Sequence, residues 1–207
     1  MKQFTWLVLI IGTALLPALS KAQTADTTIR ITSGWSEISE FKDLLNFEGL
    51  EYQKIKFSSP LLKGKRFSIR ALEIWKGEVK DSAVLETSAR NKPIKDSTFE
   101  VRVISKIDEQ KNIRLHLHMP EAMVRKAFKT IPAQAELYSL RMIAKERKQP
   151  VVLKEPFYLM AYILPIPMPG KPGWLSYCNV DNSGEDVRAW GEKLGIPHYI
   201  VFELIFF

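Results

Sequence analysis

The chain has 207 residues and a formal net charge of +7, and 46% of its residues are apolar and 26% are charged. This composition excludes intrinsically disordered and fibrous proteins and is sufficient for one good-sized globular domain. The single cysteine, Cys178, excludes an intramolecular disulfide framework, so packing must stabilise the fold. We expect a buried, inert Cys178 thiol; a nucleophile and an intermolecular bridge are the alternatives.

The first 22 residues are typical of a cleavable secretory signal peptide. Lys2 supplies positive charge, and residues 4–16 form an uncharged run of 13 residues, whereas a membrane-spanning helix needs about 20. Ser20 and Ala22 are the small residues that precede a cut after Ala22. A cut after Ser20 and an uncleaved anchor are the alternatives.

Cleavage after Ala22 leaves 185 residues with 28 basic and 23 acidic side chains, a net charge of +5. No second apolar run is long enough to span a membrane. The sequence therefore predicts an exported protein of the periplasm, the outer-membrane surface or the extracellular space, with no transmembrane span after removal of the signal.

Most of the mature chain alternates between apolar and polar residues, which is typical of half-buried β-strands. We expect strands at 27–32, 65–76, 97–106, 112–119, 135–145, 151–164 and 199–207. The polar tip 108–111 predicts a hairpin between the third and fourth of these strands. In the second strand the apolar set shifts at Ala71 and Leu72, which indicates a bulge there.

Three segments have helical spacing instead. Residues 36–45 follow a potential N-cap at Ser36, and residues 120–129 begin with Pro120, which is favourable at a first helical position. Residues 184–194 have the strongest signals, because Ser183 and Asp186 fit a capping box and Gly195 can end the helix.

These elements predict a mainly β protein: an antiparallel β-sandwich, of which the immunoglobulin-like arrangement is one option, with short helices and a C-terminal helix–strand appendage. We divide the chain into a signal peptide (1–22), a sandwich domain (23–164), a proline-rich connector (165–173) and a C-terminal helix–strand segment (174–207). That last segment is too small to fold alone, so we expect it to pack on the sandwich, with its strand entering or capping a sheet.

His116 and His118 are the strongest candidates for a metal site. Residues i and i+2 of a strand share a face, so both imidazoles could reach one ion, and Glu121 could add a carboxylate. They lie opposite the apolar set of their strand, on the face that carries Arg114. A solvated strand face is therefore the preferred interpretation, and no metal or other cofactor is predicted.

Two other features have simpler explanations than a ligand site. The run from Asp181 to Asp186 is rich in oxygen ligands, but its glycine lies two places too early for an EF-hand loop, and the run already fits a helix start. Glu203 is the one charge in an apolar strand. A charge there indicates a sheet edge or an ion pair, and a catalytic carboxylate is the less favoured interpretation. Basic clusters at 63–66, 125–129 and 145–148 are expected to be solvated.

Trp174 and Tyr177 are the best candidates for a ligand-binding platform. They follow the proline-rich connector rather than belonging to an amphipathic pattern, and exposed aromatic rings in exported β proteins bind sugar rings. Core packing is the alternative for these residues and the preferred interpretation for Trp190 and Tyr199.

No familiar catalytic motif is present in the sequence. The junction Ser20-Lys21-Ala22-Gln23, the basic mature domain and the lack of cysteine pairs resemble the uncharacterised exported β-rich proteins of Bacteroidetes. That resemblance implies a cell-envelope setting. We therefore expect a non-catalytic binding or assembly module for an envelope glycan or protein, not for nucleic acid. An envelope hydrolase or metal-dependent enzyme using His116, His118 and a carboxylate is the alternative.

Overall fold

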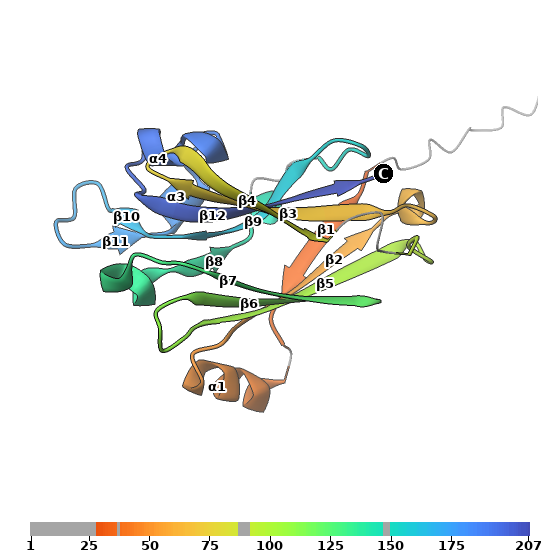
Figure 1. The fold of residues 1–207 in the computed structure, drawn as a ribbon, viewed down its shortest axis with the longest axis horizontal. Coiled ribbons are helices and arrows are strands. Elements are labelled where there is room, and N and C mark those ends of the chain that lie inside the picture. The colour runs from red at the N-terminus through yellow and green to blue at the C-terminus, as the bar shows by residue number, and fades with distance from the viewer. Residues whose placement is uncertain (1–27, 37, 87–91, 147–149) are drawn as a thin grey trace, which may run out of the picture.

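The computed structural model describes residues 28–36, 38–86, 92–146 and 150–207, with the side chains of Lys145 and Glu146 left out. The expected signal peptide lies outside the described residues, and the side chains of the basic cluster at 145–148 are not described. Two antiparallel sheets of five strands each stack face to face, with most helices at the edges and ends (Figure 1). This arrangement confirms the predicted antiparallel β-sandwich.

The first sheet has the strand order β1-β2-β5-β6-β7. Its strands are β1 (Arg30–Gly34), β2 (Glu51–Ser58), β5 (Thr98–Ile107), β6 (Ile113–Met119) and β7 (Ala122–Phe128). Alternate side chains point to opposite faces, so Val101 and Leu115 are buried in the sandwich while Arg102 and Arg114 are exposed. The predicted hairpin is confirmed, because β5 pairs with β6 up to Ile107 opposite Ile113.

The expected helix at 120–129 is wrong, because this segment forms β7. Met119 pairs with Ala122, which leaves Pro120 and Glu121 as a two-residue turn. The fixed φ of proline suits a turn as well as a helix start, so the signal at Pro120 was ambiguous. Pairing with β6 along seven positions and burial of Phe128 outweigh the local helical spacing.

The second sheet has the strand order β4-β3-β12-β9-β8. Its strands are β4 (Glu78–Glu86), β3 (Phe67–Trp75), β12 (His198–Phe206), β9 (Phe157–Ile163) and β8 (Ser139–Arg141). The C-terminal strand β12 enters the sheet between β3 and β9 and is its middle strand. Strands from both sides of the connector 165–173 are therefore neighbours in one sheet, and the C-terminal strand enters that sheet rather than capping it.

The expected strand at 135–145 is divided into three short elements. They are η2 (Pro132–Leu137), β8 and α2 (Ile143–Glu146). Because η2 follows β7 of the first sheet and precedes β8 of the second, it joins the two layers at one end of the sandwich. The connector 165–173 contains β10 (Ile166–Pro167), which pairs with β11 (Leu175–Ser176) as a small ribbon. The bulge expected at Ala71 and Leu72 is replaced by register shifts on either side of them.

The helices lie outside the two sheets. α1 (Ser39–Phe47) starts later than expected and lies below the first sheet in Figure 1, with Phe41 packed edge-on against Tyr52. The short η1 (Pro60–Leu62) follows β2. The expected helix at 184–194 is divided into η3 (Val187–Ala189) and α4 (Trp190–Lys193), after α3 (Cys178–Asp181). No helix in the described part of the chain has both the length and the apolar character needed to cross a membrane.

The core changes character along the sandwich. At one end, aromatic rings join the sheets: Phe57 packs 5.3 Å from Phe206, and Phe67 packs 4.4 Å from Phe99, measured between ring centres. At the opposite end, where β12 begins and β2 begins, polar side chains enter the interior, and His198 is completely buried. The polar end is where the candidate site lies.

Candidate functional site

A pocket of about 180 Å³ opens at the polar end of the sandwich, between the β1–β2 side of the first sheet and β8 of the second. It is lined by residues 33–35, Glu51, Gln53 and 139–142, and we term it the Glu51 pocket. This volume is large enough for several water molecules. The pocket therefore suits a small polar group.

The Glu51 carboxyl group lines this pocket and is held by two hydrogen bonds. Its Oε1 accepts hydrogen bonds from the Ser139 hydroxyl at 3.2 Å and from the Leu140 backbone N–H at 3.0 Å. Burial raises the pKa of Glu51, against the opposing effect of these hydrogen bonds and of Arg141. Burial and the neighbouring Glu51 also raise the pKa of Tyr162 well above its usual value. Glu51 thus keeps a proton to higher pH than an ordinary glutamate.

Arg141 also lines the pocket, and its guanidinium is held in place by Asp181 and Tyr177. Its Nε donates to Asp181 Oδ2 at 2.9 Å, its Nη2 donates to the same oxygen, and its guanidinium lies 6.0 Å from the ring centre of Tyr177. Asp181 is buried in this ion pair. Asp186 caps η3 by accepting from the Arg188 backbone N–H at 2.8 Å. These contacts agree with the cap-and-turn interpretation of 181–186 rather than with calcium.

Aromatic side chains lie at three different places around the C-terminal segment and the pocket. Trp35 lines the Glu51 pocket and is 53% exposed. Tyr177 is half-buried, and its hydroxyl donates to the Leu137 carbonyl at 2.6 Å, so it packs next to Arg141 and is not an open platform. Trp174 is 64% exposed in the turn before β11, with Lys171 Nζ 5.8 Å from its ring centre, and it does not line the pocket. The structure therefore does not join Trp174 and Tyr177 into one site.

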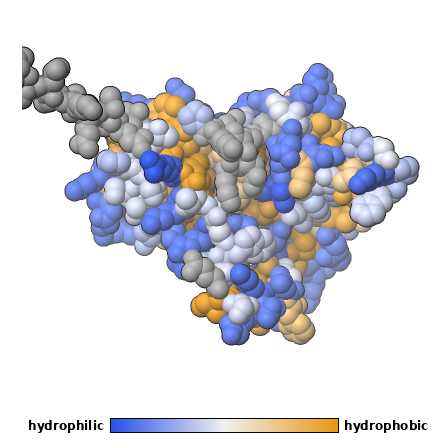
Figure 2. Space-filling model, turned by 180° about the vertical axis from the view of Figure 1, so that it is seen from behind, coloured by the Kyte–Doolittle hydropathy of each residue, from blue (hydrophilic) through white to orange (hydrophobic). Residues whose placement is uncertain are grey.

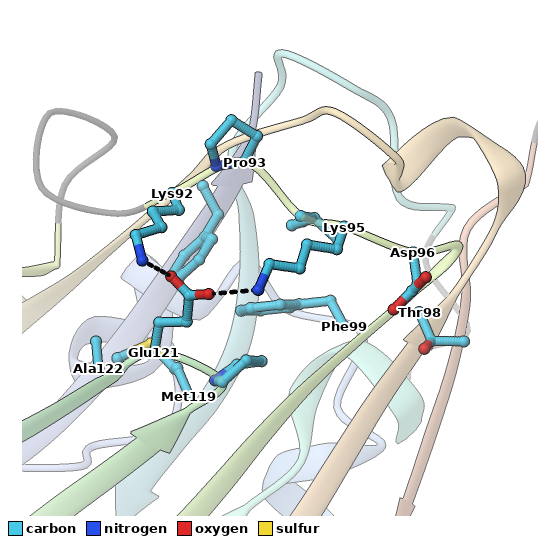
Figure 3. A pocket seen from close by; sticks show the side chains of 12 residues that line it. Lys92, Pro93, Lys95, Asp96, Thr98, Phe99, Met119, Glu121 and Ala122 are labelled. Atoms are coloured by element: carbon cyan, nitrogen blue, oxygen red, sulfur yellow. Dashed lines mark ion pairs between the residues drawn. The ribbon is translucent and has the colours of Figure 1, made fainter.

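A larger cleft of about 390 Å³ lies at the opposite end of the sandwich (Figure 3). Its floor is apolar and includes the buried Phe99 and Met119. At its mouth, Lys92 and Lys95 both bind the Glu121 carboxylate, at 3.1 and 2.9 Å, and these contacts lower the pKa of Glu121. We term it the Glu121 cleft. Its charged groups neutralise one another, so the Glu51 pocket is the better polar site.

His116 and His118 lie on the outer face of β6, with ring centres 6.4 Å apart. The sheet register places Arg125 opposite His116 and Arg102 opposite His118. Partial burial, followed by Arg125 and Arg114, lowers the pKa of His116. Glu121 is bound to the two lysines of the cleft. Across the described residues no three histidine, cysteine or acidic side chains come together as a metal site.

Two expectations about single residues are wrong. Cys178 is exposed at the start of α3 rather than buried, because it lies on the outer side of a four-residue helix. Glu203 is not at a sheet edge but in the central strand β12. Its ion pair was correctly anticipated: Oε1 lies 2.6 Å from Arg70 Nε, and Oε2 lies 3.8 Å from Arg188 Nη2.

A second group of buried polar residues lies at the same end of the sandwich as the Glu51 pocket. The Tyr138 hydroxyl is 2.6 Å from His198 Nδ1 and accepts from the Ile131 backbone N–H at 3.3 Å. The other ring nitrogen of His198, Nε2, lies 3.6 Å from Glu73 Oε1. Trp75 stacks on the imidazole with ring centres 3.9 Å apart. This group has the character of a fixed core network.

Burial lowers the pKa of His198 to about 4, and this predicts a loss of stability in acid. Above pH 6.5 the residue is neutral in both the folded and the unfolded chain; below it, only the unfolded chain gains the proton. This residue should therefore lower the free energy of unfolding by about 3 kcal/mol as the pH falls from 6.5 to 4. Urea denaturation as a function of pH measures the effect.

The matching variant is His198→Gln, which keeps a neutral polar side chain. Since the raised pKa of Glu51 acts in the opposite direction, the test is the difference between wild type and variant. That difference should decrease between pH 7 and pH 4.5. Parallel pH profiles for the two proteins would contradict the assignment of a buried neutral imidazole.

Glu51 and Gln53 were missed as candidate site residues because β2 was not predicted. Its alternation is visible in the sequence: Gln53, Ile55 and Phe57 point inward, while Lys54 and Lys56 point outward. Applied to residues 51–58, the same period-two criterion identifies the strand. It cannot show that Glu51 meets Ser139, which is 88 residues away.

Comparison with known proteins adds no relative: no family model, curated protein or solved structure matches this chain. The chemistry of the Glu51 pocket and of the surrounding surfaces is therefore the basis for the function proposed below.

Proposed function

We propose that this chain is a non-catalytic binding module exported to the cell envelope, and that the Glu51 pocket holds one sugar residue of a glycan partner. The observation that carries the proposal is the convergence of Glu51, Gln53, Ser139 and Arg141 on one small pocket with an exposed tryptophan among its lining residues. Polar groups held in fixed positions give orientation and specificity to a small-ligand site.

The chemistry of a sugar ring matches these groups. Each hydroxyl of a sugar donates and accepts hydrogen bonds, and the pocket presents carboxyl, amide, hydroxyl and guanidinium groups. The face of a sugar ring that carries C–H groups packs on an aromatic ring, and Trp35 is 53% exposed for that contact. Because Glu51 and Arg141 are held by other protein groups, few side chains must be ordered when a ligand binds.

One observation favours hydrolysis as a second candidate. The raised pKa of Glu51 is a property of general acids. Glycosidases, however, use two carboxyl groups on either side of the scissile bond. Glu51 is the one acidic side chain among the described residues that line this pocket. The metal-dependent alternative with His116 and His118 has less support, because the neighbouring arginines oppose a cation.

Titration calorimetry with free sugars tests the proposal. The probes are N-acetylglucosamine, N-acetylmuramic acid, galactose, mannose and rhamnose. We expect at least one to bind saturably, and we expect Trp35→Ala and Glu51→Gln each to weaken it by about tenfold or more. Trp174→Ala is the matched control, since it also removes an exposed tryptophan, and it should leave the affinity unchanged. Loss of binding in Trp174→Ala alone, or no binding of any probe, would refute the proposal.

A further inference from the structure

We propose that the outer face of the first sheet is a second binding surface, which takes an acidic polysaccharide. This surface is formed by the outward side chains of β1, β2, β5, β6 and β7, and we term it the basic face. It is separate from the Glu51 pocket and does not depend on it. Its support comes from charge, spacing and the shape of the surrounding elements.

Positive charge is concentrated on this side of the molecule. The outward side chains of the five strands include one acid, Glu100, and seven cations: Arg30, Lys54, Lys56, Arg102, Lys106, Arg114 and Arg125. Seven cations and one carboxylate give a net charge of +6, against +7 for the whole chain. Most of the excess positive charge of the protein is therefore on one sheet face, which produces a field that attracts polyanions.

The sheet register arranges these cations in rows. Lys54, Arg102 and His118 are directly opposite one another on three adjacent strands, and Arg114 is opposite Lys106. Adjacent strands are about 4.8 Å apart, so a chain crossing the strands meets a cation or imidazole at intervals of about 5–10 Å. Such a repeat matches a polymer with an anionic group on each sugar or on alternate sugars.

Three cations on the β5–β7 side of the face are not neutralised by neighbouring acids. Glu100 lies in the middle strand, β5, 3.1 Å from Lys54 and 3.8 Å from Arg102. Within the described part of the chain, Lys106, Arg114 and Arg125 have no acidic partner at ion-pair distance. These three residues are the most available for a ligand anion.

The shape around the face favours a narrow polymer over a membrane surface. α1 protrudes below the first sheet in Figure 1, carries Glu40 and Asp43, and ends at the C-cap residue Glu48. Figure 2 shows apolar side chains on this protruding lobe, and Leu44 and Phe47 are 54% and 86% exposed. An anionic bilayer pressed on the face would meet the acids of α1 first. A single polysaccharide chain can lie across β5–β7 beside the helix.

Single-stranded nucleic acid fits this face less well than a polysaccharide. Binding of bases relies on exposed aromatic rings on which they stack. The aromatic residue of the described outer face is Tyr52 in β2, and Phe41 of α1 covers it with ring centres 5.9 Å apart. Charge without a stacking ring favours a partner that presents carboxylate or sulfate groups.

Fluorescence anisotropy with labelled polygalacturonic acid and chondroitin sulfate tests this proposal, with neutral dextran as the control ligand. We expect binding that weakens as salt concentration rises, and no binding of dextran. The charge reversal Arg102→Glu/Arg125→Glu should weaken binding by tenfold or more. The matched control Lys63→Glu/Lys193→Glu makes the same change at exposed sites away from the face and should retain the wild-type affinity. Arg114→Gln/Arg125→Gln serves as a milder second variant if the reversal lowers stability.

Three results would overturn the proposal: equal loss in the two charge-reversal variants, equal binding of dextran, or tighter binding to phosphatidylglycerol vesicles than to either polyanion. Binding at the basic face can be tested independently of binding in the Glu51 pocket. Trp35→Ala and Glu51→Gln should bind polygalacturonic acid as wild type does. A failure of the free sugars in calorimetry with intact polyanion binding would refute the pocket alone, and the reverse result would refute the basic face alone.

Discussion

Phe202→Ala is expected to lower the free energy of unfolding by about 3–5 kcal/mol. Phe202 is fully buried in the middle of β12. Its ring packs edge-on against Phe128 of the facing sheet at 5.8 Å and against Tyr162 of β9 at 6.4 Å. Because both sheets are fixed by their backbone hydrogen bonds, the cavity left by the ring cannot close fully.

Chemical denaturation of Phe202→Ala beside Ile205→Ala measures this effect. Ile205 is on the same strand but is only half-buried, so its truncation should cost about 1–2 kcal/mol. A central β12 predicts the large difference between these variants. A C-terminal strand that merely capped a finished sandwich would give a small loss for both, and that result would contradict the topology.

Gly191→Ala is expected to destabilise the protein by about 3 kcal/mol, although it adds one methyl group. A Cβ atom at Gly191 would lie 2.2 Å from the backbone N and 2.5 Å from the Cα of Gly77. Gly77 is in the two-residue turn between β3 and β4, where Trp75 pairs with Glu78. Backbone atoms cannot rotate away as side chains do, so α4 must move off the hairpin and displace the buried Trp190.

Thermal and urea denaturation of Gly191→Ala, with Gly34→Ala as the matched control, check this expectation. A Cβ atom at Gly34 would have no neighbouring atom within 4 Å, and Gly34 does not have a positive φ. Its substitution should change stability by less than about 0.5 kcal/mol. Equal stability of the two variants would show that α4 does not approach the β3–β4 turn as closely as the structure indicates.

Two of the strands predicted from sequence, β5 and β6, were identified by their alternation of apolar and polar residues. In β5 and β6 every inward position from Phe99 to Val103 and from Ile113 to Met119 is buried and apolar. β4 lacks this signal, because it is an edge strand and most of its residues are exposed. β7 carries the signal of a helix start at Pro120, and only its pairing with β6 decides between the two structures.

The candidate site was less predictable because it depends on contacts between distant segments. Glu51 meets Ser139 across 88 residues, and Arg141 meets Asp181 across 40. The aromatic residues chosen from sequence, Trp174 and Tyr177, were near in the chain but have different environments. Sequence spacing identifies residues on one strand face, as it did for His116 and His118, but not residues that two sheets bring together.

The most direct test of the central proposal is a map of the backbone amides whose NMR signals shift as a sugar is added to isotope-labelled protein. We predict saturable shifts that are confined to residues 33–35, Glu51, Gln53 and 139–142, which line one pocket. Shifts at Trp174 or in the Glu121 cleft, with none in the Glu51 pocket, would contradict it.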